Sequence, residues 1–164
     1  MLIVADSSAL IALATCDGLD ALLLVYDEIW VPQAVYNEVV VAEKPQAIAL
    51  AAFLSGRVRE ADIMHWVLTA GGLGQGELEA MALYKQLSAD ALLIDDHRAR
   101  LIAEHNHINC IGALGLLLLA KQRGKVDEIA PYIQKLRAAS IHYGEELLNT
   151  VLKLAGEQAK DQLS

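Results

Sequence analysis

The chain has 164 residues, of which 55% are hydrophobic and 5% aromatic, and its formal net charge is -8. This length suits one globular domain with an aliphatic core, and the composition excludes a disordered or fibrous protein. The apolar N-terminal run lacks Lys and Arg, and no apolar stretch reaches the roughly 20 residues of a membrane helix. Cys16 and Cys110 lie in apolar stretches, which predicts reduced, buried thiols and a cytoplasmic protein.

The first half of the chain alternates short apolar strands with helices. Residues 2–5 are predicted to form a buried strand, and the polar turn that follows leads into an apolar helix over 9–14 with a serine as its N-cap. The next expected elements are a helix over 19–25, a strand over 28–31, a helix from 33 to about 41, a helix from Pro45 to about Leu54, a short strand around 58–59 and a helix from Asp62.

The second half continues the alternation. A glycine-rich loop over 71–76 leads into a helix from Glu77 to about Leu87. The later expected elements are a strand over 91–94, a helix to about His105, a strand over 109–111, an apolar helix from Gly112 to Gly124, and helices over about 128–138 and 143–155. We expect one domain over residues 1–155 and a frayed tail over 156–164.

The order of these elements predicts the fold class. Strands that alternate with helices imply right-handed crossovers and a parallel sheet covered on both faces. The nearly continuous apolar strands over 2–5 and 91–94 fit burial on both faces. We therefore predict a three-layer α/β/α domain with a parallel sheet of four to five strands.

Two predicted strands end directly in acidic residues, one at Asp6 and the other at Asp95 and Asp96. Ligands of open α/β sheets bind beyond the carboxyl ends of the strands, so three carboxylates meet there if these two strands are neighbours. Like charges so close raise one another's pKa unless a cation lies between them. Oxygen ligands without paired His or Cys suit Mg²⁺ or Mn²⁺ rather than zinc.

Each acid also has a purely structural interpretation. Asp6 could form an Asx turn or cap a helix, and Asp95 and Asp96 could cap the helix that follows them. Glu77 is predicted in the first turn of a helix, where the dipole favours an acid, and Glu38 could be an exposed neighbour of an apolar helix face. The joint placement of these acids at turn positions is what indicates a site.

Negative charge is concentrated in the first part of the chain. Residues 1–90 carry 4 basic and 12 acidic residues, whereas residues 91–164 carry 9 of each. Between positions 97 and 126 only Glu104 is acidic, and five residues are basic: Arg98, Arg100, Lys121, Arg123 and Lys125. This pattern predicts a local basic zone beside the paired aspartates, and the alternative is an ordinary solvated helix face.

Four segments, in this order, resemble the motifs of the PIN domain family. DSSALIAL (residues 6–13) resembles the opening motif, in which a strand-end Asp precedes a small hydroxyl residue and an apolar helix. The other three segments are VPQAVYNEV (31–39), LGQGELEA (73–80) and ALLIDD (91–96), with Glu38, Glu77 and the aspartate pair at the acidic positions.

The resemblance covers residues 2 to 150, and GALGLL (112–117) is similar to the last core helix of the family. One departure is Ile94, because many PIN toxins have Thr or Ser just before the last acidic motif. It leaves open whether Asp95 or Asp96 holds a metal.

This resemblance implies metal-dependent hydrolysis of RNA, most closely that of a toxin-like endoribonuclease. Asp6, Glu77 and Asp95 or Asp96 are the implied ligands of one or two Mg²⁺ or Mn²⁺ ions. Such a metal lowers the pKa of bound water and neutralises charge on the phosphate.

Further residues receive roles from the same resemblance. Glu38 would position or deprotonate water, and Ser8 would orient Asp6 or a metal-bound water. Arg98 and Arg100 are the implied phosphate contacts, unless they are ordinary helix-surface charges.

The implied partners are an RNA substrate, a protein antitoxin and a second copy of the chain in a homodimer, with no membrane. An alternative is a catalytically weak or inactive PIN-like module that binds RNA or a protein partner such as an antitoxin. A third class, the aspartate-nucleophile phosphatases, requires a second Asp two residues after the first, where this chain has Ser8. A receiver-type phosphoacceptor has its paired acids near the first strand, whereas here the pair comes late.

Overall fold

Five short strands form the centre of the computed structural model, which describes residues 1–65, 72–139, 141 and 143–157. They are β1 (Leu2–Ala5), β2 (Glu28–Pro32), β3 (Val58–Arg59), β4 (Ala91–Leu93) and β5 (Cys110–Ile111). All paired strands are parallel, in the order β3-β2-β1-β4-β5. The predicted parallel sheet of four to five strands is confirmed.

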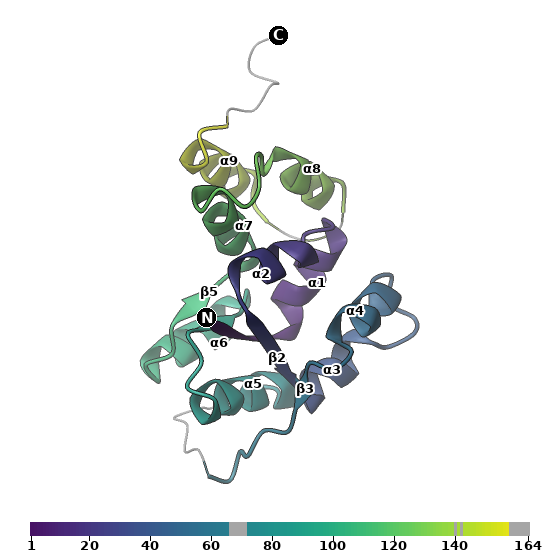
Figure 1. Ribbon diagram of the computed structural model, residues 1–164, viewed down its shortest axis with the longest axis vertical. Helices are drawn as coiled ribbons and strands as arrows, with labels where there is room; N and C mark the ends of the chain where they lie inside the picture. Colours follow the sequence, from purple (N-terminus) through teal and green to yellow (C-terminus); the bar gives the residue numbers. More distant parts are fainter. Residues whose placement is uncertain (66–71, 140, 142, 158–164) are drawn as a thin grey trace.

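Helices cover both faces of this sheet. They are α1 (Ser7–Thr15), α2 (Leu19–Val25), α3 (Gln33–Val39), α4 (Ala47–Leu54), α5 (Gln75–Gln86), α6 (His97–His105), α7 (Ala113–Gln122), α8 (Ala130–Ala138) and α9 (Glu145–Leu154). Helices α1, α2 and α7 lie on one face, and α5 and α6 lie on the other (Figure 1). Helices α8 and α9 pack on the outside of α1 and α7, so the predicted three-layer α/β/α fold is confirmed.

The core is aliphatic and is centred on the two middle strands. Ile3 and Val4 of β1 and Leu92 and Leu93 of β4 are fully buried. Burial on both faces explains why these strands are apolar without alternation. Within the described segments, Asp6 is the one buried side chain that is polar or charged.

A helix that spans a membrane needs both sufficient length and apolar character. In the described part of the chain no single helix is long and apolar enough to cross a membrane. Helices α1 and α2 pass that test only as a pair, and they are bent by 111° where they meet.

Several predicted boundaries need correction at the ends of helices. Asp6, rather than a serine, occupies the N-cap position of α1, and its side chain makes no capping hydrogen bond. The predicted helix from Asp62 is a turn as far as His65, because the Asp62 carboxylate accepts a hydrogen bond from the His65 N–H at 3.1 Å. Its continuation over 66–71 lies outside the described residues. Cys110 is half-buried, whereas Cys16 is buried as predicted, and both thiols are free.

Glu157 connects the start of α8 to the end of α7. The Glu157 carboxylate accepts hydrogen bonds from the Ile129 and Ala130 N–H groups and pairs with Lys121, with 2.8 Å between Nζ and Oε2. These contacts satisfy N–H groups at the start of α8. The rest of the predicted tail, residues 158–164, lies outside the described residues.

Replacing a core side chain of the central sheet should destabilise the protein strongly. Leu92 is 0% exposed in β4, so Leu92→Ala leaves a cavity and should lower the free energy of unfolding by about 3 kcal/mol. Leu101 is 53% exposed on α6, so Leu101→Ala should change that free energy by less than about 1 kcal/mol. Urea unfolding followed by circular dichroism measures both, and equal losses would contradict this assignment of the core.

Candidate active site

The first and fourth strands bring acidic residues together at one edge of the sheet. Strands β1 and β4 are neighbours in register, with Ala5 opposite Leu93, and the Asp6 N–H donates to the Leu93 carbonyl at 2.8 Å. Because both strands run in the same direction, Asp6 and the Asp95–Asp96 pair leave the sheet at the same edge. The two strands that end in acids are therefore neighbours, as the predicted site requires.

Asp6 is the centre of this acidic edge. Its side chain is 3% exposed, and burial raises the pKa of its carboxyl to about 7 against the lowering effect of a hydrogen bond from the Ser7 backbone. The charges of Glu77, Glu38 and Asp96 raise the pKa further. The charges of three acids from separate segments thus act on Asp6, and all four belong to the predicted set of site residues.

Glu38 reaches the site from α3 and is held by α1. The Ser7 hydroxyl donates to Glu38 Oε2 at 2.6 Å, so Ser7, rather than the predicted Ser8, contacts an acid of the cluster. A Cβ on Gly76 would lie 2.6 Å from Glu38 Oε1. A side chain at this position in the first turn of α5 would therefore displace the carboxylate of Glu38.

Glu77 lies in the first turn of α5 and is half-buried. Its Oε2 accepts a hydrogen bond from the Gly74 N–H at 3.0 Å, which satisfies a donor at the start of the helix. Glu79, which the sequence analysis did not single out, accepts from the Ala34 N–H at 3.2 Å and links α5 to the start of α3. No local sequence pattern distinguishes Glu79 from an ordinary helix-surface acid.

The paired aspartates have different surroundings. Asp96 occupies the N-cap of α6, where its Oδ1 accepts from the Ala99 N–H at 2.8 Å, and its charge acts on Asp6. Asp95 Oδ1 accepts from the Ala113 N–H at 3.0 Å, and Asp95 Oδ2 accepts a short hydrogen bond from the hydroxyl of Tyr143. A Cβ on Gly112 would lie 2.7 Å from Asp95 Oδ1. Asp95 thus joins the end of β4 to α7 and to the segment before α9.

Tyr143 is the site residue that the sequence analysis missed. Burial, together with the adjacent charge and hydrogen bond of Asp95, raises the pKa of its hydroxyl above the usual tyrosine value. The hydroxyl is therefore a neutral donor to Asp95 at physiological pH. Its position 48 residues from Asp95 along the chain explains why no motif indicated it.

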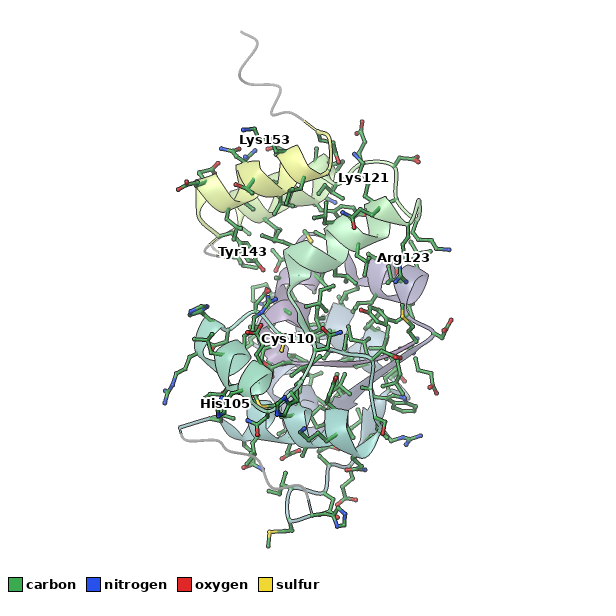
Figure 2. All side chains as sticks on the ribbon, turned by 90° about the vertical axis from the view of Figure 1, so that its left-hand side faces the viewer. His105, Cys110, Lys121, Arg123, Tyr143 and Lys153 are labelled. Carbon is green, nitrogen blue, oxygen red and sulfur yellow. The ribbon has the colours of Figure 1, made fainter. Side chains whose placement is uncertain are left out.

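The predicted basic zone is not continuous in space. Arg98 contacts Gly72 of the glycine-rich loop, and Arg100 pairs with Glu104 across 3.2 Å (Nε–Oε1). Both lie on α6 just after the aspartates. Lys121 and Arg123 lie on the other side of the molecule from the end of α6 (Figure 2). The first residue of α7, Ala113, is hydrogen-bonded to Asp95, and the helix extends ten residues, or about 15 Å. Its basic end therefore lies away from the carboxylates.

A comparison with protein families identifies the chain. A family profile described as a PIN domain matches residues 2–157, which is almost the whole sequence. The chain belongs to the PIN domain family. It has no match among curated proteins and none among solved structures. PIN domains are generally nucleases and typically use divalent metals, so the fold of this chain is of the nuclease type.

The donor set of this PIN domain suits a hard divalent cation. Its four clustered acids supply oxygen ligands alone, which Mg²⁺ and Mn²⁺ prefer. Over the described segments, no three carboxylate, imidazole or thiol groups converge on one point, because Glu38 and Glu77 are turned to Ser7 and Gly74. Burial, and after it the nearby negative charges of Glu77, Glu38 and Asp96, raises the pKa of Asp6 to about 7. The residues therefore fit a divalent metal in chemical type.

A cavity of about 610 Å³ adjoins the cluster. Ser8, Asp95 and Asp96 line one end of it, so the exposed Ser8 faces this space near the aspartates. Tyr143 and α9 line another part, and Arg100 also contributes. The described side chains of the PIN domain thus place a sheltered volume directly beside the acidic edge.

Asp6 should make the stability of the metal-free protein depend on pH. Its pKa is about 7 in the folded state and close to 3.8 unfolded, so the folded chain holds more protons between these values. The contribution of Asp6 to the free energy of unfolding should therefore fall as the pH rises from about 4 to about 7, by up to about 4 kcal/mol. Urea unfolding in EDTA should show this fall as a difference between wild type and Asp6→Asn. A difference that stays constant from pH 5 to pH 8 would contradict a raised pKa.

Proposed function

We propose that this PIN domain is a metal-dependent ribonuclease that hydrolyses internal phosphodiester bonds of RNA, as toxin-like endoribonucleases do. The observation that carries the proposal is that Asp6, at the carboxyl end of β1, is buried within reach of the charges of Glu38, Glu77 and Asp96. A protein gains no stability from such a cluster, because like charges repel and burial penalises ionisation. A site that must attract a divalent cation accounts for it.

Asp6, Glu77 and Asp96 would hold Mg²⁺ or Mn²⁺. When bound, the ion lowers the pKa of a water molecule and neutralises charge on the phosphate. The contacts of the two neighbouring aspartates support Asp96 as the ligand and Asp95 as an anchor, since both oxygens of Asp95 accept hydrogen bonds from Ala113 and Tyr143.

The remaining residues of the site would orient water or bind the substrate. Ser7 fixes Glu38 through its hydroxyl, so Glu38 is held where it could orient water or accept its proton. Arg98 and Arg100 are the cations on α6 closest in sequence to Asp96, and they would contact substrate phosphates. Ser8 lines the adjoining cavity and would contact substrate or water there.

The resemblance to PIN toxins supports three further proposals: a protein antitoxin, a homodimer and a cytoplasmic location. An antitoxin segment that carries Arg or Lys would complement the carboxylates of the site, and the net charge of -8 favours a basic partner. The competing proposal, a binding module without catalysis, leaves the accumulated carboxylates without a purpose, because negative charge repels RNA.

Cleavage of RNA should require both the metal and the clustered acids. Wild type should cleave single-stranded RNA with Mn²⁺ or Mg²⁺ and lose this activity in EDTA, and Asp6→Asn should lower kcat/KM by at least about 100-fold. Asp20→Asn, which removes an exposed charge on α2, is the matched control and should retain activity. Gel analysis of a labelled RNA measures both, and full activity in Asp6→Asn would refute the carboxylate site. No cleavage by wild type with either metal would favour the binding module.

Substitutions of the two neighbouring aspartates should have different effects on metal affinity and on the free energy of unfolding. Asp96→Asn should weaken Mn²⁺ binding by about tenfold or more, while Asp95→Asn should leave the affinity within about threefold. Asp95→Asn should instead lower the free energy of unfolding by about 2 kcal/mol, because charge-assisted bonds to Ala113 and Tyr143 are weakened. Calorimetry and urea unfolding on both variants measure the two effects. The reverse pattern would make Asp95 the ligand.

A further inference from the structure

The cavity beside the carboxylates has a composition that the hydrolysis of a phosphodiester does not itself require. Its volume is about 610 Å³, and its walls include Ile111 of β5, Leu114 of α7 and Val151 of α9. Tyr143 lies beneath α9, in the region between that helix and Cys110 (Figure 2). Apolar and aromatic side chains from several elements therefore line part of this open space, next to a strongly polar site.

The cavity is continuous with the acidic cluster. Asp96 belongs to both, since it lines the cavity and its charge acts on Asp6. Ser8, in the first turn of α1, lies at the same boundary. An RNA strand with its scissile phosphate at the carboxylates would therefore bring a flanking nucleotide to the mouth of the cavity.

The chemistry of the lining selects which part of that nucleotide enters. Asp95 and Asp96 repel a phosphate, but their carboxylates accept hydrogen bonds from N–H groups. The apolar walls favour a flat, uncharged group, and the planar guanidinium of Arg100 can stack on one. A nucleobase with an exocyclic amino group meets all these conditions, whereas uracil has a single donor, N3–H, between two carbonyl oxygens that the carboxylates repel.

The ring of Tyr143 is held in a fixed position beside the cavity. Its hydroxyl is tied to Asp95, which itself is fixed by the Ala113 N–H, so the aromatic ring is held before anything binds. A ring held in place loses little conformational freedom when a base stacks on it. Unpaired bases in RNA are recognised in this way, by stacking on aromatic side chains and by hydrogen bonds to their edges.

We propose that this cavity binds the base of one unpaired nucleotide adjacent to the bond that is cut, and that it favours adenine, cytosine or guanine over uracil. The inference rests on the proposed ribonuclease function for the position of the strand. It adds a site for base recognition, which makes the protein selective for single-stranded RNA and for the base beside the cleavage point.

Binding of nucleotides in EDTA tests the cavity without hydrolysis. Methyl resonances of Leu114 and Val151 should shift when AMP, CMP or GMP is added to the wild-type protein, and shift less with UMP. Ribose 5-phosphate, which has no base, should leave them unchanged. Equal shifts with ribose 5-phosphate, or no shift with any of the four nucleotides, would overturn the proposal.

A pair of substitutions on α9 tests the cavity with RNA. Leu147 lines the cavity and is 49% exposed, so Leu147→Trp should occupy the space without disturbing the core. Leu154 is 65% exposed on the same helix and does not line this cavity, so Leu154→Trp is the matched control. In EDTA, Leu147→Trp should weaken binding of a single-stranded octanucleotide by about tenfold relative to Leu154→Trp.

An octanucleotide with an abasic site at each position in turn completes the design. At the position whose base enters the cavity, removal of the base should abolish the difference between Leu147→Trp and Leu154→Trp. A difference that persists with every abasic oligonucleotide would overturn base binding. If wild type binds nucleotides as expected but cleaves no RNA, the ribonuclease proposal fails and the base site stands. If it cleaves RNA but shows no base-dependent shifts and the same kcat/KM for all four homopolymers, the base site alone fails.

Discussion

The burial of Asp6 beside the charges of three other carboxylates is the constraint on which the architecture of this site depends. A buried acid with three acidic neighbours has its pKa raised to about 7, so near neutral pH the fold holds a group that resists ionisation. The aliphatic core offsets the cost of burying this acid. The strands that lead to Asp6 and Asp96 are deeply buried, and their packing stabilises the fold. Stability is given up at one edge of a sheet that is otherwise well packed, as is typical of functional sites.

The fold keeps these acids together through its backbone geometry. The register of β1 and β4 places Asp6 and the paired aspartates at one edge, and the missing Cβ of Gly76 lets Glu38 approach α5. Hydroxyl and N–H donors then hold the carboxylates: Ser7 holds Glu38, and Gly74 holds Glu77. Such donors stabilise the charged forms without occupying every lone pair, so the oxygens keep the capacity to bind a cation.

The sequence predicts the part of this site that follows from strand ends and helix starts. Apolar strands that terminate in acids indicate Asp6 and the pair Asp95 and Asp96, and the glycine loop before Glu77 indicates the start of α5 within two residues. Contacts between segments that are far apart along the chain have no local sequence pattern that would predict them. Tyr143 and Asp95 meet across 48 residues, and the contact between Ser7 and Glu38 spans 31 residues. The basic residues expected between 97 and 126 are divided in the same way, because Arg98 and Arg100 lie on α6 whereas Lys121 lies near the far end of the ten-residue helix α7.

The different surroundings of Asp95 and Asp96 connect the C-terminal helices to the site. Asp95 binds the start of α7 through Ala113 and the segment before α9 through Tyr143, while Glu157 binds the start of α8 and Lys121 near the end of α7. Polar contacts thus fix this group of helices at two separated points, and α9 forms one wall of the cavity beside the carboxylates. The cavity is consequently formed before any ligand arrives, and its shape depends on the same strand end that carries the acids. A substitution that breaks the Asp95–Tyr143 bond therefore acts on the cavity first and on the carboxylates only through β4.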